Sequence, residues 1–158
     1  TQDSSSAASD VYKRQPSDLA IEDDGTRKTI GLDDLPTNFP IYDIGIDTMM
    51  RLRPLIMEAN CLLWNGPASY FEKSEFAYGT VEIMNMFTEA TGVTIVGGGH
   101  TSALFNQRGK SNQVSHNSTG GGSVLTMLSG GIMPVFESLE ASENKFRPLL
   151  RSLGISKE

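Results

Sequence analysis

The chain has 158 residues, of which 38% are hydrophobic and 20% charged, a composition typical of one globular domain with a sizeable core. Its net charge of −6 disfavours a general nucleic-acid-binding surface, because such a surface attracts phosphates with an excess of lysine and arginine. The single cysteine, Cys61, excludes an internal disulfide framework, and no apolar run approaches the ~18 residues of a membrane span. We therefore expect a cytoplasmic protein that binds neither nucleic acid nor membrane.

The first fifteen residues do not have the pattern of a folded segment. Residues 5–15 match the in-frame translation of a transposon-type sequencing-library adapter. We therefore expect residues 1–15 to be a non-native, disordered tail, followed by a folded part at residues 16–158. The alternative is a natural serine-rich disordered tail, and the codons of this stretch would distinguish the two.

The predicted elements begin with a β-hairpin. Residues 19–22 suit a strand, residues 23–25 form a turn signal that ends in glycine, and residues 28–30 suit a returning strand. Residues 36–40 contain two prolines and predict a connector, because proline removes a hydrogen-bond donor and restricts the residue before it.

From residue 41 onward, short apolar segments alternate with helical patterns. The predicted strands lie at residues 41–44, 61–64, 93–96 and 114–116. This alternation is the signature of a parallel α/β sheet, and uniformly apolar short strands fit burial on both faces. The sequence therefore predicts an α/β fold with part of a doubly wound, Rossmann-like parallel sheet.

Capping signals predict where the helices begin and end. Asp47 and Thr48 offer an N-cap for the first helix, in which Pro54 is an awkward interior residue. Ser74 suits the N-cap of the second helix, and Gly92 closes it. The remaining helices are expected from Thr101, across Val124, Leu125 and Leu128 to a break at residues 130–131, and from about Pro134 towards Leu150.

Glycine-bearing loops follow three of the predicted strands, at residues 65–66, 97–99 and 118–122. Ligands of parallel α/β sheets bind outside the carboxyl ends of the strands. There, glycine amides can approach an anion closely, and the N-terminus of the next helix adds unpaired N–H groups. Tight turns with close helix–strand packing are the alternative explanation. Neither glycine triplet has the P-loop or dinucleotide pattern, so the sequence predicts a phosphate site of another kind.

The order and spacing of these motifs resemble phosphoglycerate kinase, most closely its archaeal members, over nearly everything from about Pro16 onward. The residues that carry the resemblance are 42–45, 64–67, 71–72, 76–80, 97–99, 115–122 and 128–134. It implies the C-terminal, nucleotide-binding part of a glycolytic and gluconeogenic enzyme. The full enzyme of that family moves a phosphoryl group between 1,3-bisphosphoglycerate and ADP, with Mg²⁺ bound to the ATP or ADP.

The resemblance also implies roles for individual residues. Asn65 would hydrogen-bond the nucleotide phosphates, and Glu72 would accept hydrogen bonds from the ribose hydroxyls. The nucleotide-binding residues that it implies are Asn65, Gly66, Pro67, Ser69, Tyr70, Phe71, Glu72, Gly98, Gly99, His100 and Thr101. The catalytic residues that it implies are Gly120, Gly121 and Gly122, whose amides would face the phosphoryl group in flight.

Two residues depart from the family pattern. His100 occupies the position of a usual aspartate that helps to hold magnesium, and imidazole is a poor substitute because Mg²⁺ prefers oxygen ligands. Metal binding then rests on phosphate oxygens and water, or activity is reduced, or this branch uses the histidine differently. Ser69 replaces a usual glycine, and its Cβ could narrow the pocket or alter nucleotide preference. No residue is assigned to the metal.

Other residues that invite a functional interpretation are expected to be structural. His116 is expected at a strand end rather than in a metal site with His100, because two histidines without a carboxylate or thiol cluster are weak evidence of a metal site. The residues expected in the core are Trp64, Met84, Met86 and Met127.

Three interpretations follow. The first is a fragment of an active phosphoglycerate kinase, the second is a diverged nucleotide-binding relative without kinase activity, and the third is an unrelated α/β phosphate-binding protein. His100 and Ser69 favour the second. In the first, the phosphoglycerate site and the nucleotide-gripping lysines lie in regions of the family that this sequence does not include. We therefore expect the chain alone to be inactive and poorly stable, with an exposed sheet edge, and its full-length parent to be a monomer.

Overall fold

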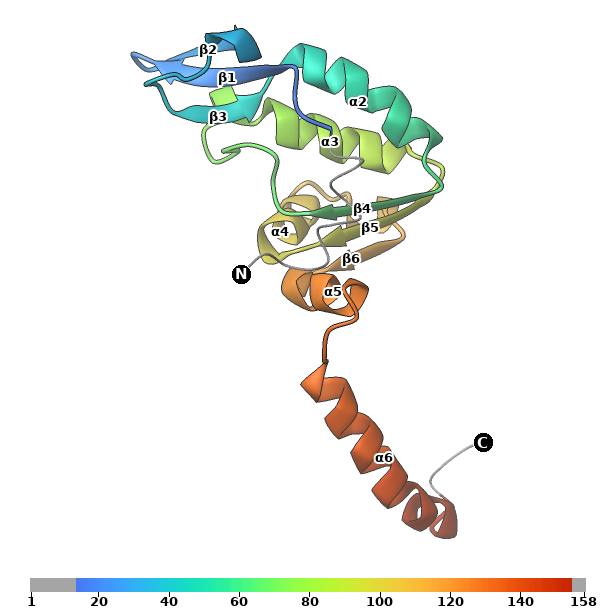
Figure 1. Cartoon of the computed structure of the whole chain (residues 1–158). Coiled ribbons are helices and arrows are strands. Elements are labelled where there is room, and N and C mark those ends of the chain that lie inside the picture. Colours follow the sequence, from blue (N-terminus) through green and yellow to red (C-terminus); the bar gives the residue numbers. More distant parts are fainter. Residues whose placement is uncertain (1–13, 155–158) are drawn as a thin grey trace. The chain divides into compact units, whose positions relative to one another are not determined.

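The computed structural model describes residues 14–154, and Figure 1 shows its elements in chain order. The chain divides into two compact units, the first ending at Gly121 and the second beginning at Gly122. Of the predicted tail, residues 1–13 lie outside the described residues. Within the described range, no helix is long and apolar enough to cross a membrane.

A small antiparallel sheet opens the first unit. Its strands are β1 (Asp18–Asp23), β2 (Thr26–Gly31) and β3 (Ile41–Ile44), in the order β2-β1-β3. The predicted hairpin is confirmed, since β1 and β2 pair in register around a turn at Asp24 and Gly25. These two residues have φ of 50° and 74°, the left-handed conformation that a tight hairpin turn requires and that glycine adopts without strain. A short 3-10 turn, Leu32–Asp34, follows β2.

The membership of β3 in this sheet corrects the predicted topology. The segment was expected to open the parallel sheet, but β3 pairs antiparallel with β1, with Leu19 opposite Ile44 and Ala20 opposite Asp43. The hairpin leaves one edge of β1 unpaired, and β3 occupies it. Alternation of strands and helices predicts elements, but it does not say which sheet each strand joins.

Two helices pack beside the small sheet: α2 (Ile46–Glu58) and α3 (Tyr78–Glu89), which is preceded by a 3-10 turn at Ser74–Phe76. The predicted N-cap at Asp47 and Thr48 is wrong, because α2 already begins at Ile46 and a carboxylate from β1 caps it. The Asp18 carboxylate accepts hydrogen bonds from the N–H groups of Asp47, at 3.1 Å, and Thr48, at 2.8 Å.

Gly45, the residue before α2, leaves space for the Asp18 carboxylate that caps this helix. A Cβ at Gly45 would lie 2.0 Å from Asp18 Oδ2, so no larger residue fits there without displacing the cap. Pro54 lies within α2 on its exposed side, where a missing N–H leaves no buried acceptor unpaired.

A three-stranded parallel sheet forms the other half of the first unit. Its strands are β4 (Cys61–Asn65), β5 (Val93–Gly97) and β6 (His116–Ser118), in the order β4-β5-β6. Both neighbouring pairs run parallel, which confirms the predicted α/β class. The helix α4 (Gly99–Gln107) follows β5 and begins two residues before the predicted Thr101, and a 3-10 turn (Ser111–Gln113) precedes β6.

The core lies on one face of the parallel sheet. Its buried residues come from β4, β5, α3 and α4 and are Trp64, Met84, Phe87, Val96, Leu104 and Phe105. On the opposite face, the side chains of Leu63 and Val93 are 39% and 51% exposed. The predicted burial of the strands on both faces is therefore wrong, because α3 and α4 pack on the same face. Trp64, Met84 and Met86 are buried as predicted.

The second unit contains the rest of α5 (Gly121–Leu128) and the helix α6 (Pro134–Ser152). The predicted break between them is confirmed, with Gly130 at a φ of 70°. Met127 was expected in the core, but it is 66% exposed, since residues 122–154 of this unit contain no strand against which α5 could bury it. Ile132, Pro134 and Phe136 line a groove of about 600 Å³ within the unit.

Candidate functional site

The three glycine-bearing loops leave the parallel sheet at the same edge. The strand register pairs Asn65 with Gly97, and Gly97 with Ser118. These are the last residues of β4, β5 and β6, so the strands end level with one another. Because all three strands run in one direction, the loops that follow them begin side by side.

Contacts between these loops leave no room for larger side chains. A Cβ at Gly98 would lie 3.1 Å from Asn65 Oδ1, and a Cβ at Gly121 would lie 2.3 Å from the same oxygen and 2.7 Å from Gly98 Cα. Gly98 also has a φ of 95°, which disfavours any other residue. Glycine is therefore required at both positions, and the structure brings Asn65, Gly98 and Gly121 into direct contact.

Two helices begin at this edge. Gly99 is the first residue of α4, and the N-cap before it, Gly98, provides no side-chain hydrogen bond. Gly121 is the first residue of α5. Thr101 is buried, and its hydroxyl accepts a hydrogen bond from the Gly66 N–H over 3.1 Å, which ties the β4 loop to α4. The positive end of the α4 dipole is thus directed to the place where the glycine loops meet.

Some of the predicted site residues lie apart from this contact. The Gly120 N–H donates to Ser118 Oγ over 3.1 Å, which closes the turn before α5. Gly122 is exposed and belongs to the second unit. Phe71 packs against the hydrophobic core, whereas Glu72 is exposed.

A second hollow lies between the β4 loop and β3. It has a volume of about 290 Å³ and is lined by Pro67, Ser69 and Tyr70 from the loop and by Tyr42 and Asp43 from β3. Asn65, Gly98 and Gly121 are not among the residues that line it. Three of the predicted nucleotide-binding residues, Pro67, Ser69 and Tyr70, thus face β3.

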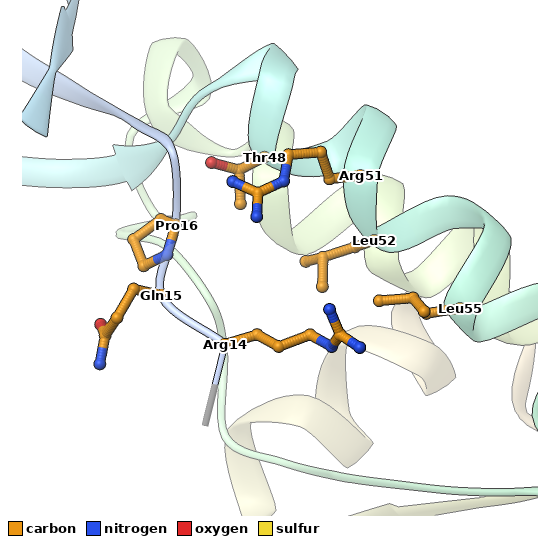
Figure 2. Close-up of a pocket in the computed structure, with 7 residues that line it drawn as sticks. All are labelled: Arg14, Gln15, Pro16, Thr48, Arg51, Leu52 and Leu55. Carbon is orange, nitrogen blue, oxygen red and sulfur yellow. The ribbon is translucent and has the colours of Figure 1, made fainter. Parts of the chain in front are cut away.

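Figure 2 shows another hollow, of about 60 Å³, beside the first turns of α2. Arg14, Arg51, Leu52 and Leu55 contribute to its walls. None of the predicted site residues lines it. It therefore adds nothing to the predicted phosphate site.

The middle of the β4 loop is bonded to two other elements. Ser69 Oγ lies 2.6 Å from Thr80 Oγ1 on α3, and the Thr80 N–H donates to Ser69 Oγ over 3.4 Å. The Tyr70 N–H donates to the Tyr42 carbonyl of β3 over 2.7 Å. The Ser69 side chain is therefore engaged with α3, a role that the sequence did not predict.

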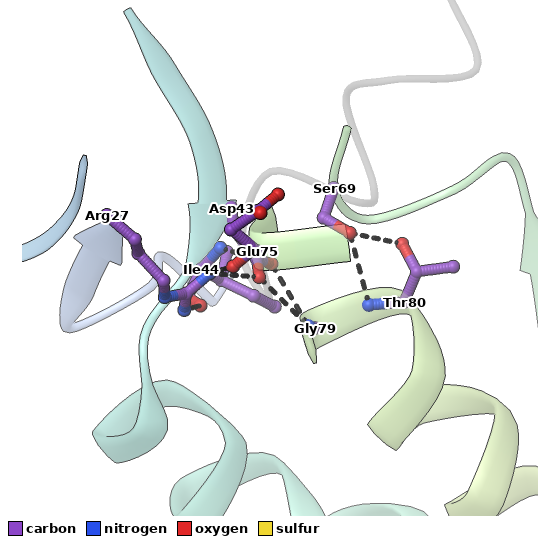
Figure 3. A network of polar contacts seen from close by, with 7 residues as sticks. All are labelled: Arg27, Asp43, Ile44, Ser69, Glu75, Gly79 and Thr80. Carbon is purple, nitrogen blue, oxygen red and sulfur yellow. Dashed lines mark hydrogen bonds and ion pairs between the residues drawn. The ribbon is translucent and has the colours of Figure 1, made fainter. Parts of the chain in front are cut away.

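An ion pair supports the start of α3, as Figure 3 shows. The fully buried Asp43 carboxylate accepts from Arg27 Nη1 at 2.7 Å and from the Gly79 N–H at 3.1 and 3.2 Å. Arg27 also donates to the carbonyls of Glu75, at 3.0 Å, and Ile44, at 3.3 Å. The predicted cap Ser74 is wrong, since α3 begins four residues later and Asp43 and Ser69 satisfy its first amides.

Lys73, the residue after Glu72, forms an ion pair within the protein. Lys73 Nζ donates to both oxygens of the Glu22 carboxylate, at 2.9 and 2.7 Å, and lies 4.9 Å from the centre of the Tyr42 ring. The hydrogen bond with Glu22, against a smaller opposing effect of desolvation, raises the pKa of Lys73. This cation joins the loop to β1 and is not directed to the glycine contact.

The residues of this site do not suit a magnesium ion held by the protein. His100, in the first turn of α4, and His116, at the start of β6, are both exposed imidazoles. Within residues 14–154, no group of three or more His, Cys, Asp or Glu residues could hold a metal ion. Since Mg²⁺ prefers oxygen ligands, the donors present at the glycine loops do not form a site for it.

This arrangement defines a class of α/β proteins in which glycine amides and helix N-termini gather at the carboxyl edge of a parallel sheet. The model of one family, "Phosphoglycerate kinase", matches residues 4–131. The chain belongs to the phosphoglycerate kinase family. The predicted resemblance is confirmed, and the interpretation as an unrelated α/β phosphate-binding protein is wrong.

Similar proteins bear the same name. The chain is 38% identical over 130 residues to phosphoglycerate kinase of Methanothermus fervidus, covering 82% of the chain and 32% of the relative. It is 39% identical over 140 residues to that of Pyrococcus abyssi, covering 86% and 34%. The chain thus spans about a third of the length of the curated relatives it matches.

Solved structures agree with the sequence relatives. The crystal structure of phosphoglycerate kinase from Pyrococcus horikoshii has a TM-score of 0.77 and 36% identity, and the match covers 86% of this chain and 34% of that one. The phosphoglycerate kinase from Coxiella burnetii has a TM-score of 0.72 and 30% identity, covering 81% and 34%. The fold is therefore that of part of a phosphoglycerate kinase.

Proposed function

We propose that this chain is the nucleotide-binding part of a phosphoglycerate kinase. The whole enzyme would transfer a phosphoryl group between 1,3-bisphosphoglycerate and ADP, giving 3-phosphoglycerate and ATP, in glycolysis and gluconeogenesis in the cytoplasm. The observation that carries the proposal is the direct contact of Asn65, Gly98 and Gly121 where α4 and α5 begin.

The phosphates of the nucleotide would lie against the uncapped start of α4. There the amides of Gly99, His100 and Thr101 are the first N–H groups of the helix, and an anion would satisfy them. Asn65 would add a side-chain amide to the same cluster. Because phosphoryl transfer depends mainly on positioning and on stabilising charge, rigid backbone amides are suitable catalytic groups. Of the three predicted catalytic glycines we assign that role to Gly121, because the Gly120 N–H donates to Ser118 Oγ and Gly122 belongs to the second unit.

The base and ribose would lie along the β4 loop. Pro67, Tyr70 and the exposed Glu72 offer, respectively, an apolar ring, an aromatic surface and a carboxylate for the ribose hydroxyls. Phosphoglycerate would be bound by a part of the enzyme that this sequence does not include, so we expect no turnover by the chain alone.

Members of the family generally use a magnesium nucleotide. The donors of this site do not suit that ion, so in the kinase it would be held by the phosphate oxygens of the nucleotide and by water, while amides and the helix dipole hold the phosphates. For the same reason, His100 favours a second candidate function, a diverged relative that binds a nucleotide without transferring phosphate.

A ¹H–¹⁵N NMR titration of the chain with ADP tests the proposal, because it detects weak binding residue by residue. We expect the largest shifts at the amides of Gly98, Gly99 and Thr101. In Gly121→Ala the new Cβ would collide with the Gly98 backbone, and these shifts should disappear. In Gly31→Ala, where the nearest atom to a Cβ is 3.8 Å away on Asp34, they should persist.

Shifts confined to other residues, or shifts that survive Gly121→Ala in a folded protein, would refute the site. Repeating the titration with Mg²⁺ separates the two candidates. A tighter complex with Mg²⁺ supports the kinase, whereas an unchanged affinity supports the diverged relative.

A further inference from the structure

The Ser69 hydroxyl is directed to the buried start of α3. Its hydroxyl lies 2.6 Å from that of Thr80, whose residue is fully buried at the start of α3. Figure 3 shows both side chains directed towards each other. The hydroxyl is therefore engaged within the protein, although Ser69 also lines the hollow beside Pro67 and Tyr70.

The next residue of the loop is held by a different element. The Tyr70 N–H donates to the Tyr42 carbonyl over 2.7 Å, and the two rings lie 5.1 Å apart. Asp43, the neighbour of Tyr42 on β3, accepts from the Gly79 N–H at the start of α3. The loop, α3 and β3 are thus joined in a closed cycle of hydrogen bonds.

Such a cycle restricts the loop before any ligand arrives. A flexible loop that becomes ordered on binding loses conformational entropy, and this loss weakens the affinity. A loop that is already fixed by Ser69 and Tyr70 loses this entropy when the protein folds, so binding does not lose it again. The hydroxyl of Ser69 is the one side-chain group that fastens the middle of the loop to α3 among the described hydrogen bonds.

We propose that Ser69 is a positioning residue, which acts through Thr80 to hold residues 66–72 in the conformation that binds the nucleotide. This rests on the proposed function of the β4 loop. It differs from the expected role of Ser69 as a residue that touches the nucleotide, because the hydroxyl is directed to α3.

Four variants of the whole chain test the proposal. Ser69→Ala and Thr80→Val each remove one partner of the hydroxyl pair, and Thr80→Ser retains the hydroxyl. Loss of one such hydrogen bond should weaken the affinity for ADP about fivefold. Ser74→Ala is the matched control, since the Ser74 hydroxyl donates only to its neighbour Glu75 among the described contacts, at 3.1 Å.

The expected pattern is a fivefold weaker complex in Ser69→Ala and Thr80→Val, and an unchanged one in Thr80→Ser and Ser74→Ala. The double variant Ser69→Ala/Thr80→Val should bind no more weakly than Ser69→Ala, because Ser69→Ala already removes both hydrogen bonds between the two residues. Full additivity, or an unchanged affinity in Ser69→Ala, would overturn the proposal.

Amide hydrogen exchange without nucleotide supplies a second readout. In Ser69→Ala the Tyr70 amide should exchange faster, while that of Val96 in the core should not change. If the unsubstituted chain binds no ADP, the proposed function fails, and the exchange rate at Tyr70 still decides whether Ser69 orders the loop. An unchanged rate at Tyr70 would overturn the positioning role.

Discussion

Helices in the first unit begin in two different ways. Those with a side-chain cap support the fold, whereas the one without a cap has amides that can bind a ligand. The helices α2 and α3 receive carboxylate or hydroxyl caps from distant segments: Asp18 for α2, and Asp43 with Ser69 for α3. The helix α4 begins after Gly98 without any side-chain cap. A helix whose first amides are satisfied by the protein is a support, whereas one whose first amides stay available can receive an anion.

Removal of the Asp43 carboxylate should have the largest effect on stability. In Asp43→Ala, Arg27 would lose its partner and the buried Gly79 N–H would be left unsatisfied. We expect the free energy of unfolding to fall by about 3 kcal/mol, the lower end for a broken buried ion pair. Urea denaturation measures it, with Ser74→Ala as a control that should change stability by less than about 0.5 kcal/mol. A similar small change in Asp43→Ala would contradict the assigned cap.

Asp18 should have a smaller effect, and one that depends on pH. Burial opposes its charged form, but hydrogen bonds from the Thr48 hydroxyl and from the Thr48 and Asp47 amides outweigh burial and lower the pKa of this carboxyl from 3.8. Because the folded state has the lower pKa, the stabilisation is present above about pH 3.8 and is lost as the pH falls through the folded-state pKa.

In Asp18→Asn the free energy of unfolding should fall by about 1 kcal/mol at pH 7, the usual value of a lost cap. Between pH 4 and pH 2 the free energy of unfolding should fall less in this variant than in the unsubstituted chain. The difference between the two falls should be on the order of the lost cap energy. Urea denaturation at several pH values checks both statements. Parallel pH profiles for the two proteins would show that Asp18 does not titrate as assigned.

The smallest effect on stability is expected at the uncapped helix α4. In His100→Asp a carboxylate would enter the first turn of α4, where the helix dipole should stabilise it by about 0.5 kcal/mol. The oxygen ligands should also make ADP binding respond to Mg²⁺, at least about tenfold. Thermal unfolding and the NMR titration measure the two effects, and His116→Asp is the matched control. Equal responses in both variants would remove the link between α4 and the nucleotide.

The sequence predicted the parts that depend on local pattern. The hairpin at Asp24–Gly25, the parallel strands β4 and β5 and the glycine loops after them all follow from periodicity and turn chemistry between neighbouring residues. The common edge of the three glycine loops was predicted from strand direction, because parallel strands place their carboxyl ends together, but the contact of Asn65 with Gly98 and Gly121 was not.

Long-range partners were not predictable in the same way. Asp47 and Ser74 have the local signature of an N-cap, but Asp18 and Asp43 replaced them from 29 and 36 residues away. Likewise, nothing in the 41–44 segment indicated that it would complete the hairpin sheet. The hydroxyl of Ser69 gave no signal for Thr80, since side-chain pairs across a loop become visible only when the fold is known.

Because β4 and β5 end level with one another, the number of residues in β5 is restricted as well as their identity. Asn65 lies opposite Gly97, so deletion of one residue within β5 would draw Gly98 back by one pleat, about 3.3 Å. That displacement exceeds the distance between a Gly98 Cβ and Asn65 Oδ1. The length of β5 is therefore as tightly constrained as its composition, and homologous chains should tolerate substitutions in this strand far more readily than insertions or deletions.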